Sequence, residues 1–230
     1  MSVQHPHPPG LTDPLARVLL ALTFTTGVVD AASYLGLGHV FTANMTGNIV
    51  LLGFGLAGSG GLPVVSPLVS LAAFLVGAGA GGLLAKRATA PGARIERALA
   101  IEVVLVAAAA GLAATVDIHP NTASGDGVIA LVALAMGVRN ATVRTLGVPD
   151  LTTTVLTLTL TGLAADSPLA GGTGSGSARR AAGVAAMLAG AVCGALLLRA
   201  SLSLPLAAAA GIALVTLLAS LPALRREAAA

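Results

Sequence analysis

Eight runs of apolar residues follow one another along the chain, separated by short polar or glycine-rich stretches. They cover residues 15–37, 40–58, 64–85, 98–116, 127–146, 151–165, 181–199 and 203–222. A helix needs roughly 20 apolar residues to cross the hydrocarbon core of a bilayer. Six of the eight runs reach that length or nearly reach it. The pattern therefore predicts an all-α, polytopic bundle of membrane-spanning helices.

Two of the runs differ from the others. Run 40–58 is interrupted by the polar letters NMTGN, and run 151–165 is short and threonine-rich, with the sequence LTTTVLTLTLTG from Leu151. Each follows its predecessor through a tight turn, GLGH or LGVPD, which leaves little room for a conventional loop. We expect both to be interrupted or re-entrant segments, so that about six helices span the membrane.

The positions of the basic residues favour the same arrangement. If all eight runs crossed, the loop KRATAPGARIER would lie outside, against the tendency of Lys and Arg to remain cytoplasmic. With six spans, this loop falls inside together with Arg17, Arg139, Arg144 and both termini, and Arg199 is the one clear exception. The predicted topology therefore has both termini in the cytoplasm.

Composition sets the domain organisation. The chain is 56% hydrophobic and only 9% charged, whereas a soluble domain carries roughly 25% charged residues. We expect a single integral membrane domain over 15–222, flanked by a disordered cytoplasmic tail at 1–14 and a second cytoplasmic tail at 223–230. The basic residues sit at the ends of apolar runs, which indicates topology rather than a nucleic-acid partner. The lipid bilayer is the expected partner.

The two unusual runs are also related to each other. The stretch TGVVDAASYLGLGHVFTANMTGN aligns with MGVRNATVRTLGVPDLTTTVLTLT. Gly27 then meets Gly137, Asp30 meets Asn140 and, after a one-residue shift, Thr42 meets Thr153 and Thr46 meets Thr157. With three spans in each half (15–116 and 127–222), the second copy lies upside down, as in many transporters. The alternative is a bundle whose short helices are unrelated.

Polar residues at membrane depth mark the candidate site. Irregular backbone survives there only where protein or a wet cavity satisfies its hydrogen bonds. A break at NMTGN would therefore place amides and hydroxyls beside the freed backbone groups or a solute, and the threonines of the second segment share one helical face. The predicted substrate-binding residues are Asp30, Asn44, Thr46, Gly47, Asn48, Asn140, Thr153 and Thr157. The alternative is that these groups only bond neighbouring helices.

Charged residues inside the spans raise further hypotheses. Asp30 is either a coupling site for an ion or a structural ion-pair partner of Arg139, because carboxylates within a membrane are costly unless they have a role. Glu102 lies little more than a turn beyond Glu96 and Arg97, so we expect an interfacial position. The glycine-rich stretches at 77–82 and 190–194 favour close helix packing or a homodimer.

Known catalytic patterns are absent from the sequence. It contains no HExxH, no GxSxG, no P-loop and no paired carboxylates, and its single cysteine, Cys193, excludes a thiolate metal cluster. An enzyme is therefore disfavoured, and no metal or cofactor is expected. The leading prediction is a small secondary transporter or permease for a small polar or weakly charged solute or ion. A non-transporting accessory subunit or sensor is the alternative.

The polar segments carry a resemblance to a known family. With TGVVDAASYLGLGHVFTANMTGNIVLLG and AMGVRNATVRTLGVPDLTTTVLTLTLTGLAAD, the chain resembles the YoaK family of bacterial multi-pass inner-membrane proteins over most of 15–222. The resemblance implies an inner-membrane location and about six spans. It supplies no substrate.

Overall fold

The structure is a bundle of helices. The computed structural model describes residues 10–88, 91–146 and 156–228, and every regular element within these ranges is helical. Six helices are long and apolar enough to cross a membrane: α1 (Pro14–Gly36), α3 (Val65–Arg87), α4 (Pro91–Thr115), α5 (Ala123–Leu146), α7 (Ser177–Leu198) and α8 (Ser203–Ala228). The shorter elements are α2 (Met45–Leu56), α6 (Leu156–Ala165) and the 3₁₀ turn η1 (Pro168–Ala170). The predicted class, an all-α polytopic membrane bundle, is confirmed.

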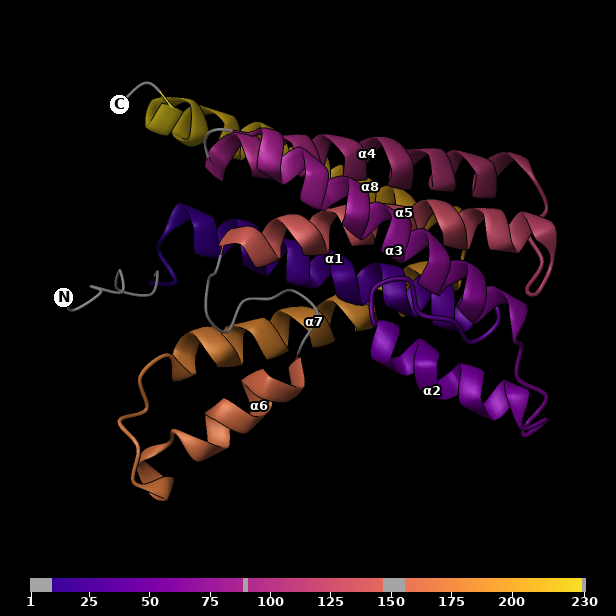
Figure 1. Cartoon of the computed structure of the whole chain (residues 1–230), viewed down its shortest axis with the longest axis horizontal. Helices are drawn as coiled ribbons and strands as arrows, with labels where there is room; N and C mark the ends of the chain where they lie inside the picture. Colours follow the sequence, from indigo (N-terminus) through magenta and orange to yellow (C-terminus); the bar gives the residue numbers. More distant parts are fainter. Residues whose placement is uncertain (1–9, 89–90, 147–155, 229–230) are drawn as a thin grey trace.

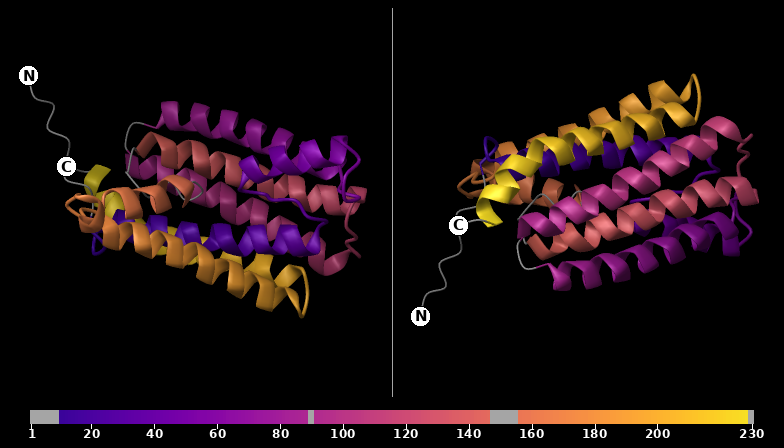
Figure 2. Two further views of the ribbon diagram at one scale, coloured as in Figure 1. Left: turned by 90° about the horizontal axis from the view of Figure 1, so that it is seen from below. Right: turned by 90° about the horizontal axis from the view of Figure 1, so that it is seen from above.

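The long helices alternate in direction along the bundle (Figures 1 and 2). At one end, here called the terminal end, α1 and α7 begin and α5 and α8 finish. At the other, the distal end, α1 and α7 finish and α5 and α8 begin. The basic residues of the 86–97 loop therefore share the terminal end with Arg17, as the six-span topology predicts.

The two short helices flank opposite ends of the bundle. Helix α2 lies beside the distal half, and α6 lies beside the terminal half (Figure 1). The described residues give α2 a length of 12 residues and α6 a length of 10, fewer than the roughly 20 of a membrane span. The described residues therefore contain six helices of spanning length and two shorter ones.

One boundary matters for the site. Helix α4 begins at Pro91 rather than near residue 98, because Pro suits the first helical position and the letters GARIER continue the helix. Glu102 is consequently about three turns inside α4 instead of one. At the C-terminus, α8 also runs beyond residue 222, to Ala228.

Helix packing repeats between the two halves. Helix α3 packs on α5 as α1 packs on α7, and α4 contacts α5 as α8 contacts α1. Within each half, α2 packs on α3 as α6 packs on α7. With the halves running in opposite directions (Figure 1), this is the inverted repeat that the sequence predicts.

Glycines make the closest of these crossings. A Cβ on Gly27 would collide with the Met187 carbonyl oxygen of α7, and a Cβ on Gly137 would collide with the Phe74 carbonyl oxygen of α3. The partner helices present their own glycines in the same way. Gly77 meets Leu134, Gly81 meets Val138, Gly190 meets Phe24 and Gly194 meets Val28. Small residues thus allow backbone to approach backbone, as is common in membrane bundles.

This packing bears on the predicted homodimer. Gly77, Gly81, Gly190 and Gly194 are buried against helices of the same chain and offer no face to a second copy. Gly79 has open space around it. A homodimer through the remaining outward-facing glycines stays a prediction.

Candidate functional site

The segment between α1 and α2 folds back toward the middle of the bundle onto Asp30. The backbone N–H groups of Thr42 and Ala43 donate to Asp30 Oδ1 at 3.0 and 2.9 Å, and Asn44 Nδ2 donates to Asp30 Oδ2 at 2.6 Å. Asp30 lies six residues before the end of α1, roughly 9 Å from it. The chain therefore re-enters the bundle before α2 begins, with its freed N–H groups satisfied by a carboxylate.

Asn48 fastens the same segment from the other side. Its Oδ1 accepts from the Phe41 N–H at 2.9 Å, and its Nδ2 donates to the Phe41 carbonyl at 2.7 Å. Ser70 of α3 accepts from Asn48 Nδ2 at 3.1 Å and donates to the Phe41 carbonyl at 2.7 Å. Asn48 is fully buried. Its amide thus holds irregular backbone inside the bundle, where water cannot.

The remaining predicted residues do not join this cluster as one group. Gly47 packs against the Phe41 ring, while Thr46 and Thr157 are exposed on the surface of α2 and α6. Asn140 is partly buried on α5 and donates to the Met136 carbonyl. Thr153 lies outside the described residues. Asp30, Asn44 and Asn48 are therefore brought together, and the substrate-binding role of all eight remains a prediction.

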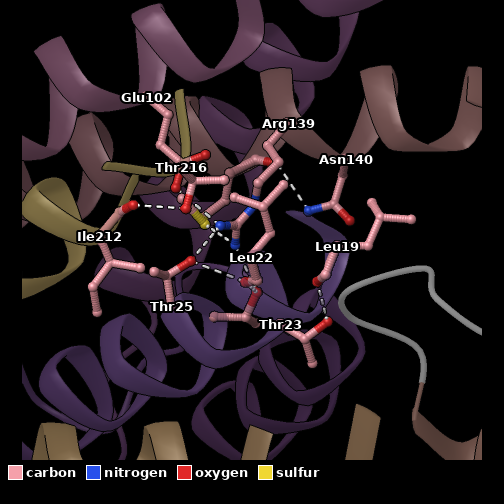
Figure 3. Close-up of polar contacts among 11 residues, drawn as sticks. Leu19, Leu22, Thr23, Thr25, Glu102, Arg139, Asn140, Ile212 and Thr216 are labelled. Atoms are coloured by element: carbon pink, nitrogen blue, oxygen red, sulfur yellow. Dashed lines mark hydrogen bonds and ion pairs between the residues drawn. The ribbon is translucent and has the colours of Figure 1, made fainter. Parts of the chain in front are cut away.

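A second polar centre lies deeper in the bundle (Figure 3). Arg139 of α5 and Glu102 of α4 form an ion pair with 2.9 Å between Nη1 and Oε1. Each residue is only 1% exposed. The expectation of an interfacial Glu102 is wrong, because the earlier start of α4 carries this residue into the membrane interior. Arg139 is likewise far from the basic terminal end, since it lies roughly 10 Å before the end of α5.

Two threonines of α1 also accept hydrogen bonds from the Arg139 guanidinium. Arg139 Nη1 donates to Thr25 Oγ1 at 2.8 Å, and Nη2 donates to Thr26 Oγ1 at 2.6 Å. Both hydroxyls donate in turn to the Leu22 carbonyl, which turns their lone pairs toward Arg139. Arg139 therefore bridges α5, α4 and α1, and so joins the two repeats.

Arg139 does not pair with Asp30. The guanidinium is close enough to act electrostatically on the Asp30 carboxylate, but its ion pair is with Glu102. The hypothesis of a structural Asp30–Arg139 pair is thus corrected. Asp30 instead accepts hydrogen bonds from the backbone N–H groups of the re-entrant segment.

The ion pair leaves two buried polar atoms unused. Glu102 Oε2 and Arg139 Nε have no hydrogen-bond partner among the described residues. A buried polar atom without a partner is uncommon and costs about 1–3 kcal/mol, more when the group is charged. The pair is therefore under-satisfied, with capacity for one further acceptor and one further donor.

Apolar layers close the ion pair off on both sides. The terminal plug consists of Ala16, Leu19, Leu22, Ile95, Leu99, Val143 and Ala213. The distal plug is larger and consists of Val28, Val29, Ala32, Leu37, Val40, Ala43, Val106, Ala109, Ala110, Val128, Ile129, Val132, Ala135, Met136, Leu206, Ala209 and Ala210. Glu102, Arg139 and the threonines at 23, 25 and 26 fall between the two plugs along α4, α5 and α1. The ion pair thus occupies a polar layer inside an occluded bundle.

A cavity of about 590 Å³ opens beside the terminal plug. Its walls come from the beginnings of α1 and α4 and the ends of α5 and α8: Asp13, Pro14, Leu15, Arg17, Val18, Ala21, Gly92, Ile95, Leu146, Val215, Thr216, Ala219 and Ser220. A void of about 10 Å³ lies next to it and reaches Arg139, with room for about one water. Val18, Ile95 and Leu146 line both spaces.

The void borders Arg139 and shares three lining residues with the cavity. Side chains of the terminal plug, among them Leu19 and Leu99, line the void. None of the described residues predicted to bind substrate lines either space. The sequence did carry a signal for this centre: an arginine two turns from the end of a span, with a threonine pair on another span.

Comparison with known proteins identifies a family but assigns no biochemical activity to it. Residues 18–219 match the family described as "Protein of unknown function (DUF1275)". The "UPF0700 transmembrane protein YoaK" of Bacillus subtilis (strain 168) is 37% identical over 154 residues, which cover 65% of this chain. The same region covers 65% of that relative, somewhat less than two thirds of its length. No solved structure matches.

Proposed function

The chain belongs to the DUF1275 family, whose members are proteins of unknown function, and we propose that it is a small secondary transporter or permease. It moves a small polar or weakly charged solute without changing it chemically. The membrane is the bacterial inner membrane, with the basic terminal end in the cytoplasm. The protein's relative YoaK is described only as a transmembrane protein.

The cavity at the terminal end is the observation that carries this proposal. Its volume of about 590 Å³ is in the range of small-molecule sites, roughly 300–1,000 Å³. We propose that it leads, through the neighbouring void, to the buried ion pair that lies between two inverted repeats. Sites near the interface of inverted repeats are the usual plan of secondary transporters. A cavity near an ion pair that has unused hydrogen-bonding atoms favours a solute site over a purely structural role.

The structure changes which residues carry the proposed site. Asp30, Asn44 and Asn48 already have partners in the re-entrant segment. Their proposed role is therefore to hold α2 and its approach in place. Arg139 and Glu102, with the threonine hydroxyls beside them, become the proposed solute contacts.

A ligand screen followed by a blocked-route variant tests the proposal. Purified protein in detergent is heated with ions, amino acids, sugars, short organic acids and nucleobases. A solute at a hundredfold excess over its Kd stabilises the native state by about 2.7 kcal/mol. Any hit is then followed as counterflow exchange in proteoliposomes.

Val18→Phe provides the matched variant for the exchange assay. Val18 borders both the cavity and the void, so the larger ring narrows the route. Val192→Phe makes the same change on α7, where Val192 is 52% exposed on the outer face. We expect exchange to be lost only in Val18→Phe. Equal exchange by both variants contradicts the proposed route, and a panel without hits together with a co-purifying partner favours an accessory subunit.

A further inference from the structure

The carboxylate of Glu102 engages only one of the three nitrogen atoms of the Arg139 guanidinium. A guanidinium and a carboxylate commonly meet through two parallel hydrogen bonds. Here the pair has a single contact, from Nη1 to Glu102 Oε1. Nη2 is bound to Thr26 and the Met136 sulfur, and Nε is free among the described residues. Arg139 is thus fixed in position but only partly neutralised.

Arg139 lies at the inner end of the proposed route. Arg139 lines the void that adjoins the cavity, together with Leu19, Leu22 and Leu99. Arg139 is 1% exposed, and its other N–H groups are held by α1, by α4 and by Met136 of α5. A solute group that passes the terminal plug therefore meets a fixed positive charge with one N–H to spare.

We infer, on the basis of the transport function proposed above, that the solute is a small monovalent anion that replaces Glu102 on Arg139. Glu102 takes up a proton on Oε2 as it is displaced. Before the exchange the layer holds Arg⁺ and Glu⁻; afterwards it holds Arg⁺, the anion and neutral Glu. The charge of the layer is the same in both states. One anion and one proton therefore cross together, and no net charge moves.

Electrostatics requires the proton in this scheme. A carboxylate that loses its partner inside a membrane is a strongly destabilising charge. The groups near Glu102 come from the neighbouring helices. Arg139 lies on α5, and α1 carries Thr25 and Thr26 and, about a turn further along, the acidic Asp30. α8 has no charged residue between 203 and 220. No second cation in these stretches is available to take the place of Arg139.

The two acids near Arg139 are not equivalent. Asp30 accepts two backbone N–H groups and one amide N–H, none of which belongs to Arg139. Glu102 accepts from Arg139 alone, and its second oxygen is free among the described residues. Glu102 is therefore the acid that must change protonation when the solute arrives.

Proton uptake on ligand addition tests this inference. Sodium acetate, sodium lactate and sodium nitrate are added to purified protein in weakly buffered detergent, with acetamide and lactamide as neutral counterparts. We expect binding of at least one of the anions and about one proton taken up per anion bound. Glu102→Gln keeps an acceptor for Arg139, and it should bind the anion without proton uptake. Arg139→Lys loses the planar donor array and should bind it weakly.

A variant far from the ion pair serves as the control. Thr115→Val, an exposed change on the distal end of α4, should behave as wild type. Anion binding without proton uptake by the wild type, or uptake that persists in Glu102→Gln, overturns the inference. So does equal binding of amides and anions, or a neutral solute that is the only one exchanged in counterflow. If neither anions nor neutral solutes bind or exchange, the proposed transport function itself fails.

Discussion

Gly27 and Gly137 occupy equivalent positions in the two repeats and make the same contact. Each faces a backbone carbonyl on a long helix of the other repeat, that of Met187 for Gly27 and that of Phe74 for Gly137. Because the repeats run in opposite directions, the two contacts lie on opposite flanks of the bundle. The halves therefore fit together through matched backbone surfaces, with the ion pair between them.

A methyl group at Gly137 should weaken this fit. In Gly137→Ala the new Cβ collides with backbone, which has no rotamer to change, and overpacking of this kind costs about 1–3 kcal/mol. Gly79→Ala places the same methyl group in open space on α3. Both changes gain the same helix propensity, so their difference isolates the collision. Thermal unfolding in detergent measures it, and equal midpoints would contradict the packing described above.

The Arg139–Glu102 pair should show strong coupling in a double-mutant cycle. Arg139→Met leaves Glu102 buried without its cation, and Glu102→Leu leaves Arg139 without its anion. Each single change should destabilise the protein by about 3–5 kcal/mol, whereas the double change should recover most of the loss. Unfolding by titration with a denaturing detergent gives the four stabilities. Additive losses would show that the two side chains act independently.

The amide of Asn48 should matter far more than the neighbouring hydroxyl of Thr46. Asn48→Ala removes the hydrogen bonds to Phe41 and Ser70 and leaves the Phe41 N–H unpaired, which costs about 1–3 kcal/mol. Thr46→Ala changes an exposed residue and should stay within about 0.5 kcal/mol of wild type. Thermal unfolding compares them. A larger loss in Thr46→Ala would place the support of α2 elsewhere.

Equivalent positions in the two repeats should differ in their accessibility to a reagent added from either side of the membrane. Val18 lines the cavity, and its repeat counterpart Val128 is fully buried in the distal plug. In a Cys193→Ala background, Val18→Cys should react with a membrane-impermeant thiol reagent from the terminal side. Val128→Cys should react from the distal side only when a transported solute is present, as the opposite half opens. Absence of any solute-dependent labelling at Val128 would argue against alternating access.

Topology can be tested with one acidic residue from each end. Glu96 lies near the start of α4, at the terminal end, and Asp117 follows the end of α4, at the distal end. Cysteines at these positions in a Cys193→Ala background should be labelled from opposite faces of the membrane, with Glu96→Cys reacting on the cytoplasmic side. Labelling of both from one face would be incompatible with a span between them.

The sequence predicts the spans well because each depends on local composition. Runs of apolar residues and the interruption at NMTGN identify six long helices and the two short ones. The repeat was also visible, through letters such as Gly27 and Gly137 that packing forces to be small. These features are properties of single segments or of two segments compared directly.

The candidate site was harder to predict because it depends on how helices are rotated against one another. Asp30 and Asn48 were recognised as buried polar groups, but composition does not say whether an amide bonds a loop or a solute. Glu102 and Arg139 are 37 residues apart and meet only after α4 and α5 pack. Arg139 was grouped with the basic residues of the terminal end, since charge near the end of a run usually indicates topology.

The packing of one half against the other also affects how the protein is inserted into the membrane during translation. Nearly all contacts between long helices join one half to the other, so the first half enters the membrane before its partners have been translated. Until α5 arrives, Glu102 has no Arg139 beside it, and Gly77 and Gly81 face lipid. We therefore expect the first half to reach its packed state only after α5, α7 and α8 have been inserted.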